Sequence, residues 1–374
     1  MIKRRIFSKI KENLFLGKAI IIYGPRQSGK TTLLNELRSS ISSRILSLDG
    51  DEPDTRQKLT NVTSSQLMTL FSGYEAVMID EAQRIENIGL TIKLIVDKIK
   101  GIQLIATGSS SFELANKIME PLTGRKLEFH LFPFSVSELK EDHGETEEQR
   151  QLENRLLYGM YPEVVTNPAN ALQILKSLTT SYLYKDILAF QDMRKPEMFG
   201  QLLEALALKV GSEVSFSELS QIVHADPVTI ERYIYMLEQA FVIFRLRALS
   251  RNVRNELKKS RKIYFTDNGV RNAIIANFNP LNLRNDKGAL WENLLVSERY
   301  KALHYQNLFV NTWFWRTTQQ QEIDYIEEKD GRLSAYEFKI NPAKKARLPK
   351  TFSAAYPDHT FETITPANYF SFLE

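Results

Sequence analysis

Two glycines, a lysine and a threonine follow a short apolar run near the start of the chain, at spacings suited to holding a polyphosphate. Residues 20–23 predict a buried strand, and residues 31–40 predict a helix. The residues between them fit the P-loop pattern G-x-x-x-x-G-K-[ST]: Gly24, Pro25, Arg26, Gln27, Ser28, Gly29, Lys30 and Thr31. Backbone N–H groups of such a loop and the positive end of the helix would face the phosphates. The alternative is a glycine-rich turn that binds nothing.

Individual side chains of this loop have separate predicted roles. We expect Lys30 to contact the β- and γ-phosphates and the hydroxyl of Thr31 to ligate Mg²⁺. Thr32 is included as a nucleotide contact, and Arg26 would either touch phosphate or project outward. The predicted cofactors are therefore ATP and Mg²⁺.

Two acidic residues, Asp80 and Glu81, follow the apolar residues 76–79. A buried strand there would deliver both carboxylates to its carboxyl end, where ligands bind in open α/β sheets. Asp80 would hold Mg²⁺, and Glu81 would act on the water that attacks the γ-phosphate. An exposed turn is the alternative for an isolated Asp-Glu pair.

Further polar residues follow two more predicted strands. Thr107 and Ser109 lie in the stretch 102–111, a predicted strand that ends in a hydroxyl-rich loop. They could sense the γ-phosphate, although both residue types also favour turns. Arg125 precedes a strand over 126–131 and could contact the γ-phosphate in cis or from a neighbouring subunit. It could equally be a solvated surface arginine.

Length and composition limit the number of domains and the class of protein in which these motifs occur. A chain of 374 residues predicts two to four domains. No stretch approaches the roughly 20 apolar residues of a membrane span, and the basic N-terminus lacks the features of a signal peptide. The absence of cysteine excludes disulfides and thiolate sites, and five scattered histidines argue against zinc. We therefore expect a cytoplasmic protein. The net charge of +4 is too small to indicate by itself that the protein binds nucleic acid.

A family resemblance rests on six stretches in this order: YGPRQSGKTTLL, MIDEAQ, IATGSSS, LTGRKLEFHLFPFS, LYGMYPEVV and YLYKDIL. The chain resembles prokaryotic AAA+-like ATPases of the AAA-14 type, whose C-terminal domain is of uncharacterised function. The likeness covers nearly the whole chain. One departure is Met160, where such proteins usually have a second glycine, and it puts the geometry of that turn in doubt.

The middle of the chain is predicted to be helical. Residues 141–200 suit a small helical lid like those of AAA+ relatives. Residues 201–275 outline a winged helix, in which Ser217 would cap one helix and a second helix would run over 228–239. That second helix would present Thr229, Arg232 and Tyr233 to DNA or RNA.

Basic residues cluster over 245–262, and such a patch could neutralise phosphates of DNA or RNA. Its members are Arg245, Arg247, Arg251, Arg254, Lys258, Lys259, Arg261 and Lys262. A solvated hairpin, a domain interface or a protein-binding surface is the alternative.

The tail carries a second set of acids. Asp324 lies on a predicted strand, Glu337 and Lys339 share one face of the next, and Glu292 lies on a helix upstream. The set resembles the core of PD-(D/E)XK nucleases, with Glu292, Asp324 and Glu337 holding a divalent cation and Lys339 steadying the attacking water. Residues 319–321 could line the start of the strand that carries Asp324. E-x-K patterns are frequent on exposed strands, however, and such a tail could serve binding only. We expect Asp267 to fix a turn before a helix.

Together these observations predict an α/β protein with a P-loop parallel sheet (1–140), a helical lid (141–200), a winged helix (201–275) and a smaller α/β nuclease-like domain (276–374). The predicted function is a Mg²⁺-dependent ATPase acting on or with nucleic acid, which could form homo-oligomers and has no membrane partner. The alternative is a nucleotide-gated switch or scaffold with a protein partner and no nuclease activity.

Overall fold

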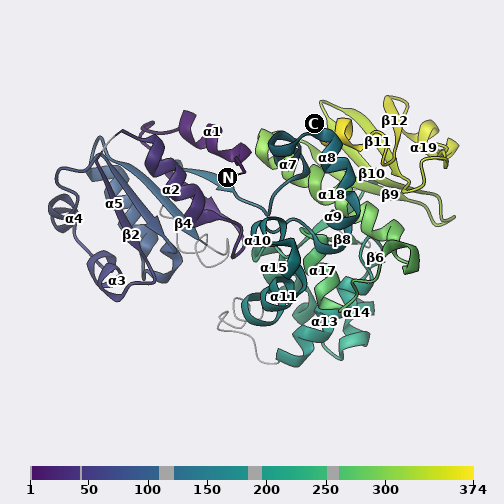
Figure 1. Cartoon of the computed structure of the whole chain (residues 1–374), viewed down its shortest axis with the longest axis horizontal. Helices are drawn as coiled ribbons and strands as arrows, with labels where there is room; N and C mark the ends of the chain where they lie inside the picture. The colour runs from purple at the N-terminus through teal and green to yellow at the C-terminus, as the bar shows by residue number, and fades with distance from the viewer. Residues whose placement is uncertain (1, 43, 109–121, 184–195, 251–260) are drawn as a thin grey trace. The chain divides into compact units, whose positions relative to one another are not determined.

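The computed structural model describes residues 2–42, 44–108, 122–183, 196–250 and 261–374 (Figure 1). The chain forms two compact units. The first contains Met1–Phe134 and Gln239–Phe241, and the second contains Ser135–Glu238 and Val242–Glu374. Residues 135–140 of the predicted segment 1–140 belong to the second unit, and residues 239–241 of the predicted winged helix belong to the first. The predicted boundaries within the second unit stay predictions.

The first unit is built on a five-stranded parallel sheet. In space the strands lie in the order β2-β3-β4-β1-β5. Every residue of β1 and β4 is buried, as expected for central strands of a parallel sheet covered on both faces. The strand bounds are Ala19–Tyr23 for β1, Ile45–Asp49 for β2, Ala76–Asp80 for β3, Gln103–Gly108 for β4 and Lys126–His130 for β5.

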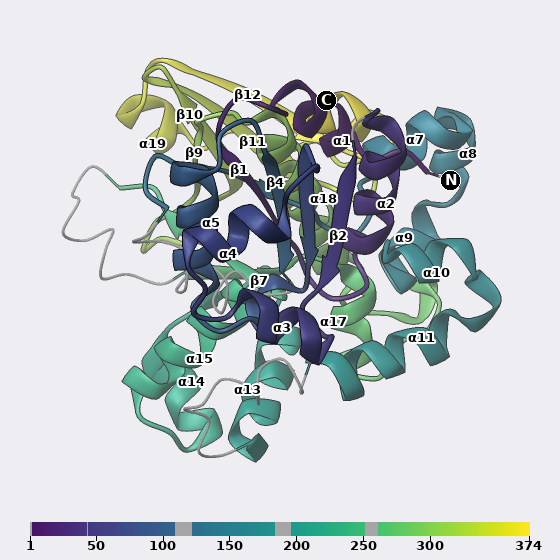
Figure 2. The same ribbon diagram turned by 90° about the vertical axis from the view of Figure 1, so that its left-hand side faces the viewer.

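Helices cover both faces of this sheet. Helix α2 leads from β1 outward to β2, whereas α5 leads from β3 in the opposite direction to β4, so right-handed crossovers place α2 and α5 on opposite faces (Figure 2). Their bounds are Lys30–Ser40 for α2 and Ile88–Lys98 for α5. The other described helices of this unit are α1 (Arg5–Glu12), α3 (Pro53–Leu59), α4 (Ser64–Leu70) and the 3₁₀ turn η1 (Ala82–Arg84).

A seven-stranded mixed sheet forms the centre of the second unit, in the order β12-β11-β10-β9-β7-β8-β6. Neighbouring strands are antiparallel except for the pairs β11–β12 and β7–β9. Because β7 pairs with β9, the predicted winged helix and the predicted nuclease-like domain share one sheet. The bounds are Glu213–Val214 for β6, Ile243–Ala248 for β7, Arg261–Phe265 for β8, Asn311–Arg316 for β9, Glu322–Lys329 for β10, Arg332–Phe338 for β11 and His359–Ile364 for β12.

Helices surround this second sheet, and the longest described one, α18, runs over Lys287–Gln306. The helices before it are α7 (Val136–His143), α8 (Glu145–Arg150), α9 (Leu152–Tyr158), α10 (Pro162–Thr166), η2 (Pro168–Asn170), α11 (Ala171–Ser177), the π-helix η3 (Leu178–Leu183), α13 (Pro196–Leu208), α14 (Phe216–Val223), α15 (Pro227–Gln239), α17 (Asn268–Ile274) and η4 (Leu281–Leu283). After α18 follow α19 (Lys350–Ala355) and α20 (Tyr369–Leu373).

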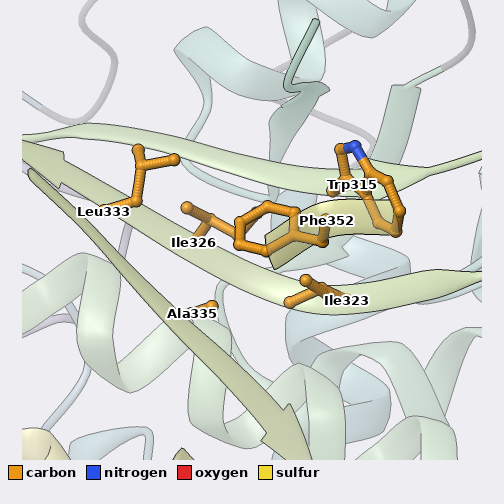
Figure 3. Close-up of a cluster of buried hydrophobic side chains, with 6 residues drawn as sticks. All are labelled: Trp315, Ile323, Ile326, Leu333, Ala335 and Phe352. Atoms are coloured by element: carbon orange, nitrogen blue, oxygen red, sulfur yellow. The ribbon is translucent and has the colours of Figure 1, made fainter. Parts of the chain in front are cut away.

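A cluster of buried apolar side chains packs α19 against one face of the strands β9 to β11 (Figure 3). Phe352 of α19 meets Trp315 of β9 edge-on, with ring centroids 5.2 Å apart. Ile323 and Ile326 of β10 both join the cluster although they are three residues apart. A shift of register between them explains this, because an irregularity in the strand allows both side chains to reach one face.

Asp267 fixes the turn before α17, as predicted. Its carboxylate accepts hydrogen bonds from the N–H groups of Val270 at 3.1 Å and Met160 at 2.6 Å. Gly159 has a φ of +70°, and a Cβ there would lie 2.0 Å from Asp267 Oδ1. The glycine is therefore required, whereas Met160 uses only its backbone in this contact and fits the turn. Within the described ranges, none of the helices has the length and apolar character needed to cross a membrane.

Candidate active site

The P-loop of the first unit joins the end of β1 to the start of α2, and it requires Gly24 for space and Gly29 for its backbone conformation. A Cβ on Gly24 would lie 2.2 Å from the carbonyl oxygen of Leu131. Gly29 has a φ of +95°, and Gln27 has a φ of +59°, so the loop turns its backbone tightly ahead of the helix. The first N–H groups of α2 thus lie at the carboxyl edge of the sheet, where an anion would meet them.

Lys30, the first residue of α2, lies inside the curve of the loop. Its ammonium group donates hydrogen bonds of 3.0 Å to the carbonyl oxygens of Gly24 and Pro25. The side chain is almost fully buried. The predicted phosphate-binding cation is therefore in the loop, held by groups that phosphate oxygens could replace.

Three side chains from three elements meet at the end of β3. The Thr31 hydroxyl donates to Asp80 Oδ2 at 2.7 Å, and the Thr107 hydroxyl donates to Asp80 Oδ1. The Thr107 oxygen also accepts the backbone N–H of Glu81 at 3.3 Å. A hydroxyl and a carboxylate on neighbouring elements are the oxygen donors that Mg²⁺ prefers, so Thr31 and Asp80 fit the predicted ion. Thr107 lies where the sensor was predicted, whereas Ser109 lies outside the described residues.

Glu81 has an unusual backbone conformation, with φ +45° and ψ +42°. A non-glycine residue in this region is strained, and such strain concentrates at functional sites. The neighbouring Gly50 allows the turn, because a Cβ there would lie 2.3 Å from the Glu81 carbonyl oxygen. Gln83 donates to Glu81 Oε2 at 2.5 Å and so orients the carboxylate.

Arg4 supports the P-loop from outside its motif. Its guanidinium donates to the carbonyl oxygen of Ser28 at 3.0 Å and to that of Phe132, and lies 4.7 Å from the ring centroid of Phe134. Arg4 is buried. Arg4 is a site residue that was not predicted from the sequence, where it is part of a basic N-terminus with no evident target.

Arg125 lies at the opposite edge of the sheet from the P-loop. It precedes β5, its carbonyl accepts the N–H of Ala19 at the start of β1, and its side chain donates to Asp97 at 2.7 Å. Five residues of parallel strand, roughly 15 Å, separate this edge from the loop. The predicted contact in cis is therefore wrong, because the strand direction points Arg125 away from its own site. The contact in trans stays a prediction.

The predicted nuclease-like residues lie in an acidic cluster of the second unit. The cluster also contains three residues outside the PD-(D/E)XK pattern, namely Lys262, Tyr264 and Glu322. Lys262 of β8 lies 2.9 Å from Glu292 of α18 and 2.6 Å from Glu322 of β10. The Tyr264 hydroxyl donates to the same Glu292 oxygen at 2.6 Å. Lys339 is paired with Glu337 at 2.7 Å. Because Lys262 and Tyr264 are two apart on β8, their common direction could be predicted, but their partners on α18 and β10 could not.

Asp324 lies within electrostatic range of two other carboxylates. Burial, followed by the charges of Glu292 and Glu337, raises the pKa of Asp324 to about 8. Burial by itself would lower the pKa of Lys262, but Glu292 and the neighbouring carboxylates raise it above its ordinary value. In the part of the chain that the structure describes, no three His, Cys, Asp or Glu side chains are arranged to hold a metal ion. The predicted metal site at Glu292, Asp324 and Glu337 stays a prediction.

A short loop joins α14 to α15, as predicted. The exposed face of α15, however, differs from the face that was predicted to read nucleic acid. Ser215, not Ser217, caps α14 by accepting the N–H of Glu218 at 3.1 Å. Tyr233 is buried against Phe199, with ring centroids 5.9 Å apart, so it cannot read a nucleic acid. Thr229 donates to Asp226 at 2.5 Å in the first turn of α15. Of the three predicted readers, Arg232 is the exposed one.

Most described members of the predicted basic segment have structural contacts. Arg245 makes a bidentate pair with Glu238 at 2.6 and 2.5 Å. Arg261 lies over the ring of Phe216, and Lys262 is buried in the acidic cluster. Arg247 is exposed. Arg251, Arg254, Lys258 and Lys259 lie outside the described residues.

Three models of known families match successive segments of the chain. Residues 16–140 match the model of AAA_14, an AAA domain. Residues 149–283 match DUF8612 and residues 287–367 match DUF4143, both described as domains of unknown function. The chain therefore contains an AAA-type, ATP-binding ATPase domain followed by a DUF4143 domain.

Related proteins align with this chain over most of its length. The uncharacterized protein Rv2008c of Mycobacterium tuberculosis is 27% identical over 362 residues, covering 95% of this chain and 77% of its own. The uncharacterized protein MJ1544 of Methanocaldococcus jannaschii is 22% identical over 383 residues, covering 95% and 82%. Among solved structures, a Walker-type ATPase of Pyrococcus abyssi has a TM-score of 0.51 at 16% identity and covers 74% of this chain and 96% of its own. That likeness concerns the fold, which is a P-loop ATPase fold with a second sheet domain.

Proposed function

We propose that the protein hydrolyses ATP with Mg²⁺ at the end of β1 and β3. The contact that carries this proposal is the hydrogen bond of 2.7 Å between Thr31 and Asp80, because it joins the P-loop helix to the acidic strand end. The loop amides would bind the phosphates. Lys30 would exchange its two carbonyl partners for β- and γ-phosphate oxygens.

Thr31 and Asp80 would hold the magnesium ion, which when bound neutralises charge on the phosphates. Glu81 is the residue that would orient the attacking water and accept its proton. The hydrogen bond from Gln83 fixes the carboxylate of Glu81 at one oxygen and leaves the other for water. The proposed products are ADP and inorganic phosphate.

Two substitutions test this assignment. The Lys30→Ala variant removes the cation that faces the phosphates, and we expect no measurable ATP binding by isothermal titration calorimetry. The Glu81→Gln variant should bind ATP like the parent but turn over at least about 100-fold more slowly. Lys18→Ala, at an exposed lysine before β1, is the matched control. ATP binding by Lys30→Ala equal to that of the parent would refute the site.

We also propose that the protein acts with nucleic acid, which it contacts through its second unit. The supporting observation is a cavity of about 580 Å³ beside the acidic cluster, lined by Lys287, Lys339 and Lys344 together with the apolar residues Phe338, Ile340 and Pro342. Ammonium groups can neutralise the phosphates of a single strand, while apolar side chains contact its bases. This cavity is a further candidate surface beside the 245–262 segment, which stays a prediction.

The binding of a fluorescent single-stranded oligonucleotide at several salt concentrations tests this contact. The double variant Lys287→Ala/Lys344→Ala should bind more weakly, and the slope of log affinity against log salt should fall by roughly 1 to 2. Lys98→Ala/Lys100→Ala removes the same charge from the first unit and should change neither quantity. Equal affinity and slope in the first variant and the parent would exclude this surface.

A nucleotide-gated switch with a protein partner is the second candidate function. It is favoured by α15, whose exposed residues Val228, Glu231 and Tyr235 suit a protein surface better than a phosphate backbone. The chain would then oligomerise or bind its partner only with ATP, and its hydrolysis would not respond to nucleic acid. Elution volumes of Glu81→Gln with and without ATP, and ATPase rates across a polynucleotide panel, separate the two candidates. A chain without cysteine is compatible with the reducing cytoplasm, where either function would be exercised.

A further inference from the structure

The acidic cluster of the second unit contains a cation of its own. Lys262 is 1% exposed, and its ammonium group lies 2.9 Å from Glu292 Oε1 and 2.6 Å from Glu322 Oε1. A buried ammonium is retained in a protein interior only when carboxylates compensate its lost hydration. Lys262 therefore balances negative charge at the centre of this cluster.

One oxygen of each carboxylate that would coordinate a metal accepts a hydrogen bond from a neighbouring group. Glu292 Oε1 accepts from both Lys262 and Tyr264, and Asp324 Oδ2 accepts the N–H of Phe338 at 2.8 Å. Glu337 Oε1 accepts from Lys339. A divalent cation bound to Glu292 would lie beside the buried Lys262 ammonium, which is 2.9 Å from Glu292 Oε1, so repulsion between the two positive charges disfavours a metal here.

We propose that Lys262 is the resident cation of this cluster, so that the second unit is stable without a divalent metal and does not carry out metal-dependent phosphodiester cleavage. In this arrangement the ammonium group joins β8, α18 and β10, which belong to two of the predicted domains. The acids therefore stabilise the junction between these elements. This inference does not depend on ATP hydrolysis, and it limits the role of the second unit toward nucleic acid to binding.

The test compares the metal response of two variants in nucleotide-free protein. Both variants are made in an Asp80→Asn background, so that the carboxylate of the first unit cannot contribute. Lys262→Met removes the ammonium and leaves the carboxylates uncompensated, so millimolar Mn²⁺ or Ca²⁺ should raise its melting temperature. Lys262→Arg retains the charge and should show no such rise, like the Asp80→Asn parent.

Direct measurements on the parent keep the inference testable if Lys262→Met does not fold. We expect that electron paramagnetic resonance detects no Mn²⁺ bound by the Asp80→Asn protein. We also expect no nicking of supercoiled DNA in Mg²⁺ or Mn²⁺. Binding of one Mn²⁺ per chain, or nicking, that is lost in Asp324→Asn would overturn the proposal. Neither result would affect the assignment of the ATP site.

Discussion

The hydroxyl of Thr31 and the carboxylate of Asp80 lie 2.7 Å apart, although 49 residues separate them in the chain. Thr31 is the second residue of α2, and Asp80 is the last residue of β3. Because β1 and β3 are parallel, both strands end at the same edge of the sheet, and the loop after β1 can approach the end of β3. This contact makes one site of two motifs that are far apart in the sequence.

Loss of the Thr31 hydroxyl should weaken the response to magnesium. Thr31→Val keeps the shape of the side chain but removes the oxygen, so we expect half-maximal ATPase activity to need at least about tenfold more Mg²⁺. Thr31→Ser keeps the oxygen and should behave like the parent. The measurement is ATPase rate against Mg²⁺ concentration at saturating ATP. Equal curves for the valine and serine variants would contradict the role of the hydroxyl.

The strain at Glu81 leads to a second prediction, in which stability and activity change in opposite directions. Glycine adopts positive φ at little cost, so Glu81→Gly should stabilise the first unit by about 1 kcal/mol while abolishing turnover. Asn61 has a similar φ of +54° but lies outside the site. Asn61→Gly is therefore the control, and it should leave the ATPase rate unchanged. A destabilised Glu81→Gly variant in thermal unfolding would argue that its backbone is not strained.

Arg4 should affect nucleotide binding from a position outside the motif. Arg4→Met removes a buried charged donor from the carbonyls of Ser28 and Phe132, so we expect the first unit to lose about 2 to 3 kcal/mol of stability. The KM for ATP should rise because the loop is less well held. Lys3→Met changes an exposed neighbour and should alter neither quantity. The idea fails if Arg4→Met lowers stability and leaves the KM for ATP at the parent value.

The sequence predicted those parts of the protein whose signals are local. The P-loop, the acidic strand end and the cap at Asp267 each depend on residues close together in the chain. The face of α15 was also predictable, since Ile230, Tyr233, Ile234 and Leu237 follow the spacing of a buried helical stripe. That spacing contradicts Tyr233 as a reader.

Contacts between distant elements could not be predicted in this way. The pairing of Lys262 with Glu292 and Glu322 requires β8, α18 and β10 to be placed in three dimensions. The position of Arg125 depends on the edge of the sheet at which β5 begins. Arg4 reaches Phe132 across 128 residues. A basic or acidic residue in a sequence shows that a charge is present, whereas its partner is decided by topology.

The second unit should lose stability at low pH through Asp286. This residue lies between Arg271 and Arg284, with nitrogen–oxygen distances of 2.6 and 2.7 Å. Burial alone would raise the pKa of Asp286, but hydrogen bonds from Arg284 and Arg271 lower it to about 2 from 3.8. Because the folded-state pKa is below the unfolded value, the contribution is complete above pH 4 and is lost as the pH falls toward 2.

The expected size of this contribution is about 2 kcal/mol, because the pKa of Asp286 falls from 3.8 to about 2 on folding. Asp286→Asn should therefore unfold more easily than the parent at pH 7, and the difference should shrink as the pH falls from 4 toward 2. Urea unfolding followed by circular dichroism at several pH values measures it. Asp358→Asn, at an exposed aspartate, should show no such dependence. A difference between Asp286→Asn and the parent that stays constant across this range would mean that the carboxylate charge does not stabilise the two arginines.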